Sequence, residues 1–183
     1  KYVKQAQEIS GQTHDIRVFI YAYNLEGLIY SKQKMYNNAI QKFEKAIALS
    51  RKYYFVPDTA CFLYLNLSDT YYRKEAYDEA LYHIQIAHRL CQITGDQNMH
   101  AIVYYTFAEI YFKLKDLSKA DTYVEKATEL AKKVELTSEY LGLLALKAHI
   151  AMDRQSKDVL NICQEGIKRA EQTKLYDKKK EFH

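Results

Sequence analysis

Proline and glycine are scarce in this chain of 183 residues, which contains one proline and five glycines. An all-β protein with many hairpins needs more of both residues in its turns, so the composition argues against that class. Long helices with short connections fit the composition better. Hydrophobic residues make up 48% of the sequence, and no segment is of low complexity, so a disordered chain is not expected.

Long apolar runs are missing as well. No stretch of roughly 18 apolar residues occurs, so we expect no membrane-spanning helix. No basic segment followed by an apolar one opens the chain, and we therefore expect no signal peptide. The cysteines Cys61, Cys91 and Cys163 are odd in number and lie in apolar stretches. Such cysteines are typical of free thiols in a reducing compartment, which predicts a cytoplasmic location.

A strong charge of one sign is also lacking. The chain has 27 basic and 23 acidic residues, and this small, mixed excess does not indicate direct binding to nucleic acid. No glycine-rich phosphate loop and no nucleophile motif is present. His83 and His88 lie five residues apart, off a single helical face, and no cysteine or carboxylate pair completes a metal-ligand set. We therefore predict no enzymatic activity, no cofactor and no metal site.

What the chain does contain is a repeat with a period of roughly 40 residues, a length typical of stacked repeat units. Three landmarks recur in step, and each occurs three times at nearly equal spacing. They are Tyr30, Tyr71 and Tyr111, then Ala39, Ala80 and Ala120, then Ala46, Ala87 and Ala127. Such a repeat indicates an array of two-helix units, each of which completes its core by packing against its neighbour.

Each unit has two helical stripes separated by a turn. In the first unit, Tyr23, Gly27 and Tyr30 belong to one stripe, and Phe43 belongs with the recurrent alanines in the next. Small residues at one position of the first helix (Gly27, Ser68 and Ala108) should let the second helix approach closely. We expect the turns at residues 34–37, 75–78 and 115–118. The pair Pro57-Asp58 should begin a helix, and Gly95 should end one.

The phase of the repeat divides the chain as follows. Ala6 lies one period before Ala46, which indicates a partial unit at the start. We expect a single array over residues 1–183, with a partial repeat at 1–13, clear repeats at 20–53, 61–94 and 101–134, a degenerate repeat at 139–172, and the start of a further helix at 175–183.

These patterns resemble the tetratricopeptide repeat (TPR). The match is carried by Tyr30-Ser31 through Ala39-Ile40, by Phe43-Glu44-Lys45-Ala46, and by Tyr71-Tyr72 through Tyr77-Asp78-Glu79-Ala80-Leu81. The chain departs from the usual pattern in three ways. Its period is longer than the roughly 34 residues of the usual unit. It lacks the proline that often closes a unit, and it has Glu26 where a large apolar residue is typical. The longer period is similar to that of bacterial regulators that sense secreted peptides, of the Rap, NprR and PlcR type.

The resemblance implies an all-α fold, a right-handed α-solenoid whose concave wall is formed by the first helices. The residues on that wall are candidates for binding a peptide or protein segment, because they combine aromatic rings, amides and both signs of charge. They are Tyr21, Asn24, Phe62, Asn66, Asp69, Tyr72, Arg73, Tyr105, Glu109, Phe112 and Lys113. Alternatively, the aromatic residues only pack neighbouring helices, and Asp69 and Glu109 pair with Arg73 and Lys113 of their own helices. Their negative charge argues against a C-terminal carboxylate as the ligand.

The predicted function is that of a peptide- or protein-binding scaffold, the sensor or interaction domain of a larger bacterial transcriptional regulator. Two alternatives stay open at this point. The chain is also similar to TPR segments of sensor kinases. As a structural or adaptor module, it would self-associate into a homo-oligomer through an apolar helix face exposed at an incomplete end.

Overall fold

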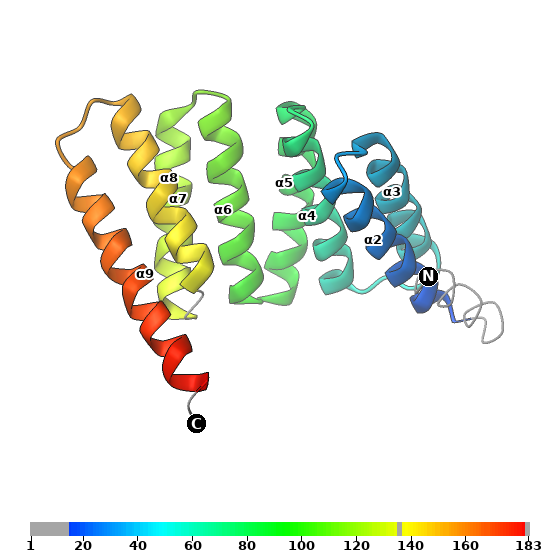
Figure 1. Ribbon diagram of the computed structural model, residues 1–183. Helices are drawn as coiled ribbons and strands as arrows, with labels where there is room; N and C mark the ends of the chain where they lie inside the picture. The colour runs from blue at the N-terminus through cyan, green and yellow to red at the C-terminus, as the bar shows by residue number, and fades with distance from the viewer. Residues whose placement is uncertain (1–14, 135–136, 182–183) are drawn as a thin grey trace. The chain divides into compact units, whose positions relative to one another are not determined.

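The computed structural model describes residues 15–134 and 137–181, and every regular element within these residues is an α-helix (Figure 1). The chain divides into two compact units, Lys1–Asp96 and Gln97–His183, here called the N-terminal and C-terminal units. The N-terminal unit contains α2 (Ile16–Lys32), α3 (Tyr36–Tyr53), α4 (Pro57–Arg73) and α5 (Tyr77–Thr94). The C-terminal unit contains α6 (Gln97–Lys113), α7 (Leu117–Lys133), α8 (Thr137–Asp153) and α9 (Val159–Glu181). The all-α solenoid class is thereby confirmed.

Helices pack in pairs in the order of the repeat. In the N-terminal unit α2 packs on α3, α3 on α4 and α4 on α5, and in the C-terminal unit α6 packs on α7, α7 on α8 and α8 on α9. The first helices of the three clear repeats begin four residues before the expected bounds. The expected partial repeat at residues 1–13 lies outside the described residues, and the continuity of one array over residues 1–183 stays a prediction.

A left-handed residue stands in each tight turn between paired helices. In the first turn the N–H of Lys34 donates to the carbonyl of Ser31 at 3.0 Å, and that of Met35 donates to the carbonyl of Tyr30 at 2.9 Å. These two hydrogen bonds cap the last carbonyls of α2 and together form a Schellman motif. The left-handed residues recur at the repeat period, with φ from 54° to 66°, at Lys34, Glu75, Lys115 and Gln155.

Each predicted turn extends two residues too far. The second helix of each pair begins directly after the Schellman motif, at Tyr36, Tyr77 and Leu117. Two other boundaries are confirmed. Pro57 stands in the first turn of α4, where its missing N–H leaves no helical bond unmade. Gly95 ends α5 with φ of 71°, a conformation that glycine adopts without steric penalty.

The turn at Gln155 defines the register of the fourth repeat. Ala39 follows the left-handed Lys34 by five residues, and five residues after Gln155 stands Leu160. Leu160 is 73% exposed, whereas Ala39 and its two equivalents are fully buried.

The expected new helix at residue 175 is wrong, because α9 runs without a break to Glu181. No glycine or proline occurs after Gly166 to end it.

Small residues set the distance between paired helices, as expected. A Cβ atom added at Gly27 would lie 2.6 Å from the ring of the fully buried Phe43, so any larger residue would force that ring to shift. The equivalent positions in the next two repeats hold Ser68 with Ile84 and Ala108 with Val124, all buried. The first-helix residue is thus larger wherever the second-helix residue is smaller than Phe, which conserves the volume packed between the helices.

In each of the three clear repeats, tyrosine rings of the first helix border a space, here called the aromatic slot. A different side chain of the second helix fills this slot in each repeat. In the third repeat the ring of Tyr123 stacks on Tyr111 with a centroid distance of 5.5 Å. In the first repeat Lys42 fills the slot, with its Nζ 5.3 Å from the Tyr23 ring, and forms an ion pair with Glu26. The unusual Glu26 is therefore matched by a cation on the facing helix.

The slot of the second repeat holds His83, and we expect it to make the protein less stable in acid. His83 stacks on Tyr71 at 5.2 Å and on Tyr64 at 6.0 Å, and its buried Nδ1 has no hydrogen-bond partner among the described residues. Burial lowers the pKa of His83 below its ordinary value of 6.5, and Glu79 opposes this only in part. The unfolded chain therefore binds the proton more readily, so the free energy of unfolding falls as pH falls below about 6.5.

Urea midpoints measured above and below that pH test this expectation. The matched control is His83→Tyr, which reproduces the residue found at the equivalent Tyr123 and does not titrate in this range. The variant should lose less stability than the natural chain on acidification. An equal loss in both proteins would show that His83 does not carry the pH dependence.

Candidate functional site

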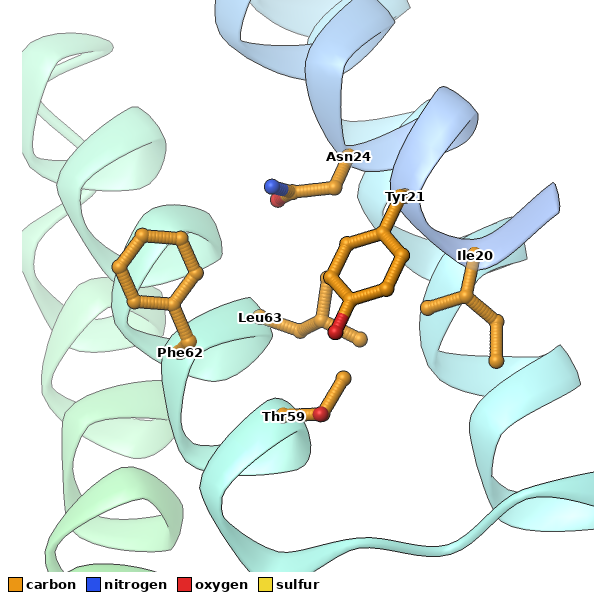
Figure 2. A pocket seen from close by; sticks show the side chains of 6 residues that line it. All are labelled: Ile20, Tyr21, Asn24, Thr59, Phe62 and Leu63. Carbon is orange, nitrogen blue, oxygen red and sulfur yellow. The ribbon is translucent and has the colours of Figure 1, made fainter. Parts of the chain in front are cut away.

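A small pocket lies between α2 and α4 of the N-terminal unit (Figure 2). Its volume is about 160 Å³, close to that of an apolar cavity of about 150 Å³ that holds one benzene molecule. The pocket is therefore sized for one apolar side chain and is smaller than the roughly 300–1,000 Å³ of typical small-molecule sites. It is lined by Ile20, Tyr21 and Asn24 of α2 and by Thr59, Phe62 and Leu63 of α4.

The walls and floor of the pocket come from different faces of the two helices. Tyr21 and Phe62 occupy equivalent positions of consecutive first helices, and their rings stand on either side of the opening with exposures of 60% and 43%. Ile20 and Leu63 are almost fully buried and contribute apolar surface at the base. A partner side chain entering between the two rings would therefore be removed from water on several sides.

A pair of amides borders the pocket. The Asn66 Nδ2 atom donates to the Asn24 Oδ1 atom at 2.9 Å, and Asn24 is itself buried and lines the pocket. Further along the same two helices the hydroxyl of Thr70 donates to that of Ser31 at 3.3 Å. After their mutual bond, the two amides still offer both a donor and an acceptor to a third group. That combination matches the N–H and C=O of a peptide main chain.

Two other candidates on α4, Asp69 and Arg73, lie along one stripe with Phe62 and Asn66. The Arg73 Nε atom is 2.7 Å from the Asp69 Oδ2 atom, and both side chains are about half exposed. This is the intrahelical pairing that the sequence left as an alternative, and such exposed pairs contribute only about 0.3–0.5 kcal/mol. Tyr72 lies beside the stripe, with its ring centroid 5.8 Å from that of Tyr77.

The four candidates of the C-terminal unit lie on α6, where α8 engages two of them. The Tyr105 hydroxyl donates to Glu109 at 3.1 Å, and its oxygen lies 3.1 Å from where a Cβ at Gly142 of α8 would stand. Phe112 stacks on His149 of α8 with a centroid distance of 6.2 Å. Helix packing therefore accounts for both aromatic rings, and the fourth candidate, Lys113, is exposed.

Sequence reasoning missed Thr59, Ile20 and Leu63 as residues of the pocket. A signal for Thr59 was present, because it precedes Phe62 by three residues and so lies on nearly the same helical face. Ile20 and Leu63 carry no such signal. Their apolar side chains belong to the packing stripe, and only the opening between α2 and α4 gives them a second role.

Metal-ligand clusters and membrane spans are both missing from the described part of the chain. Among the side chains that the structure describes, those of residues 15–134 and 139–172, no group of three or more His, Cys, Asp or Glu could hold a metal ion. Within the same ranges, no helix has both the length and the apolar character needed to cross a bilayer.

Solved structures with the same fold include the following three proteins. BtubC (BKLC) from P. vanneervenii is 16% identical with a TM-score of 0.74, and the match covers 92% of this chain and 67% of that one. PH0952 from Pyrococcus horikoshii, a STAND protein with a tetratricopeptide repeat sensor, is 20% identical with a TM-score of 0.81. The match covers 94% of this chain and 27% of PH0952. The apo form of RapI is 15% identical with a TM-score of 0.76, and the match covers 93% of this chain and 47% of RapI.

At these identities the likeness concerns the fold alone, and the chain spans about a quarter of PH0952 and less than half of RapI. No curated protein sequence matches the chain significantly. Family models of the tetratricopeptide repeat match residues 20–53 and 58–133, which together make up more than half of the chain. With its paired helices, recurrent small residues and these matches, the chain belongs to the tetratricopeptide repeat superfamily.

Proposed function

We propose that the N-terminal unit binds an extended peptide or protein segment along α2 and α4. One apolar side chain of the partner occupies the pocket between Tyr21 and Phe62, and the partner's main chain meets the amides of Asn24 and Asn66. The observation that carries this proposal is the position of Asn24, which lines the pocket and also forms the amide pair.

The chemistry of an extended chain fits this arrangement. Such a chain leaves its N–H and C=O groups unpaired along its edges, and its side chains point alternately to opposite sides. A residue that fills the pocket therefore brings its own main-chain groups close to the amide pair. The pocket supplies apolar burial, and the amides supply hydrogen bonds that do not depend on the partner's sequence.

The charged side chains along α4 indicate which charges the partner segment should carry. Asp69 and Arg73 form an exposed pair on the stripe that continues from Asn66. A partner that carries both signs of charge can form ion pairs with Asp69 and Arg73 in place of their own pair. The free-energy cost of breaking that pair is small, since exposed pairs are weak. A C-terminal carboxylate at Asp69 would meet a like charge, so we propose an internal segment of a partner as the ligand.

We further propose that this binding unit serves as the sensor or interaction domain of a larger cytoplasmic bacterial regulator, without binding nucleic acid itself. Two observations support the wider role. TPR units are generally interaction modules without catalytic groups. Two proteins with the same fold, RapI and a STAND protein with a tetratricopeptide repeat sensor, are both longer than this chain.

A peptide-selection experiment tests the proposal. Random short peptides displayed on phage are selected on the natural protein, and the recovered peptides are titrated by calorimetry. We expect peptides with a large apolar residue. We also expect the double variant Asn24→Ala/Asn66→Ala to bind them at least about tenfold more weakly, because about two hydrogen bonds to the main chain are lost.

The matched control is Asn37→Ala/Asn38→Ala, which removes two exposed amides of α3 in the same unit. Thermal melting of both variants establishes that each is folded at the titration temperature. The proposal is wrong if no peptide is recovered, or if the pocket-side and control variants bind the recovered peptides equally well.

A further inference from the structure

Two buried cysteines lie on the paired helices α4 and α5, and α4 also lines the pocket. Cys61 of α4 and Cys91 in the last turn of α5 are at most 1% exposed. The Cys61 thiol lies 3.3 Å from the carbonyl oxygen of Ala87, which is one helical turn before Cys91 on the same face of α5. The Cys61 thiol therefore faces the stretch of α5 that carries Cys91.

The two thiols differ in the direction in which their pKa values are shifted. The pKa of Cys61 is raised, first by its interaction with the Cys91 thiol and then by burial. The pKa of Cys91 is lowered by its interaction with the Cys61 thiol, against the opposing effect of burial. Cys91 is therefore the thiol that more readily becomes a thiolate, and the thiolate is the nucleophilic form of cysteine.

Packing does not require thiols at these positions. The equivalent pair is Ile20 and Ser50 in the first repeat and Ala101 and Ala131 in the third, and all four of these residues are as deeply buried as the cysteines. The repeat thus tolerates apolar and hydroxyl side chains at both places. Among the three clear repeats, only the second has an oxidisable side chain at both of these described positions.

We propose that Cys61 and Cys91 form a reversible disulfide that joins α4 to α5. In the sequence, Cys61 stands between Thr59 and the pair Phe62 and Leu63, which form the α4 wall of the pocket. The bond therefore ties that wall to the neighbouring helix. The inference concerns the thiols alone and does not depend on peptide binding.

The oxidant must be small because both thiols are buried, and hydrogen peroxide meets this condition. The Cys91 thiolate attacks one peroxide oxygen, the O–O bond breaks, and the sulfenic acid and a hydroxide form, which takes up a proton to become water. The Cys61 sulfur then attacks the Cys91 sulfur and displaces the hydroxyl group, which leaves as a second water with the Cys61 proton. Two thiols lose two electrons in total, and one peroxide is reduced to two waters.

The test uses a Cys163→Ser variant, because the exposed Cys163 would otherwise form mixed or intermolecular disulfides. The folded variant is treated with hydrogen peroxide and analysed by intact mass and peptide mapping. We expect a loss of two hydrogen atoms per chain, a peptide linking Cys61 to Cys91, and a higher melting temperature that dithiothreitol reverses, since a cross-link restricts the unfolded chain.

Two further variants make the outcome decisive. Cys61→Ala and Cys91→Ser, each in the Cys163→Ser background, copy Ala101 and Ser50 and should fold while showing neither the mass loss nor the rise in melting temperature. The inference fails if the two thiols stay reduced while Cys163 of the natural chain is oxidised, or if they are oxidised separately to sulfinic acids without becoming linked.

Discussion

Replacing Phe43 with Val lowers the free energy of unfolding by about 2–4 kcal/mol, somewhat less than the roughly 3–5 kcal/mol of a Phe-to-Ala change. The side chain is fully buried, and its ring fills the space left open by Gly27 of the facing helix. The loss combines the removal of apolar surface from the core with the cavity that remains. Urea unfolding of the purified chain measures it.

The same contact predicts a strong coupling between the two residues. Gly27→Ala alone should lower the free energy of unfolding by about 1–3 kcal/mol, because its methyl group meets the Phe43 ring. The better helix propensity of alanine offsets up to about 1 kcal/mol of this. The double variant Gly27→Ala/Phe43→Val reproduces the pair Ala108 and Val124. It should lose at least about 1 kcal/mol less than the sum of the single changes.

Additive losses would contradict this account of the repeat. They would mean that Gly27 and Phe43 affect stability separately, and that the matching pairs Ser68 with Ile84 and Ala108 with Val124 do not reflect volume packed between the helices. Equal slopes of the unfolding free energy against urea in all four proteins confirm that a common transition is compared.

Filling the pocket should abolish binding with little effect on folding. Thr59→Phe places a ring in a cavity of about 160 Å³ at a position that is only half buried, so the core behind it is unchanged. A selected peptide should then lose its anchoring side chain and bind at least about thirtyfold more weakly, since anchors in pockets commonly contribute about 2 kcal/mol or more. Calorimetric titration of the selected peptide measures the change.

Thr122→Phe is the control for this substitution, because Thr122 is exposed on α7 of the other unit. It adds the same ring to the surface without filling the pocket, and it should leave the affinity unchanged. If Thr59→Phe binds the peptide as tightly as Thr122→Phe does, the pocket is not the anchoring site.

The helical repeat was predictable because its evidence is periodic. Ala39 and Ala46 recur with the period of the packing surface, and the fully buried alanines confirm that interpretation. The turn boundaries were less accurate, because the left-handed residues are Lys34 and its equivalents, and neither Lys nor Glu signals such a turn. For the same reason the register of the fourth repeat became visible only through the φ angle of Gln155.

The candidate site was predictable in part. Tyr21, Phe62, Asn24 and Asn66 could be named because they lie off the packing stripe of a first helix, and the structure brings them together. Their pairing could not be named, because Asn24 and Asn66 are 42 residues apart and occupy positions that the repeat does not relate. Contacts of this kind depend on how two neighbouring helices are rotated, which periodicity alone does not determine.

The most direct test of peptide binding by α2 and α4 is site-specific photo-crosslinking. A photoreactive phenylalanine analogue replaces Tyr21 in one protein and Tyr82 in another, two tyrosines of the same unit that are both 60% exposed. With a selected peptide bound, irradiation should cross-link the peptide at position 21 and not at position 82. Equal cross-linking at both positions, or cross-linking at position 82 alone, would contradict the proposed binding site.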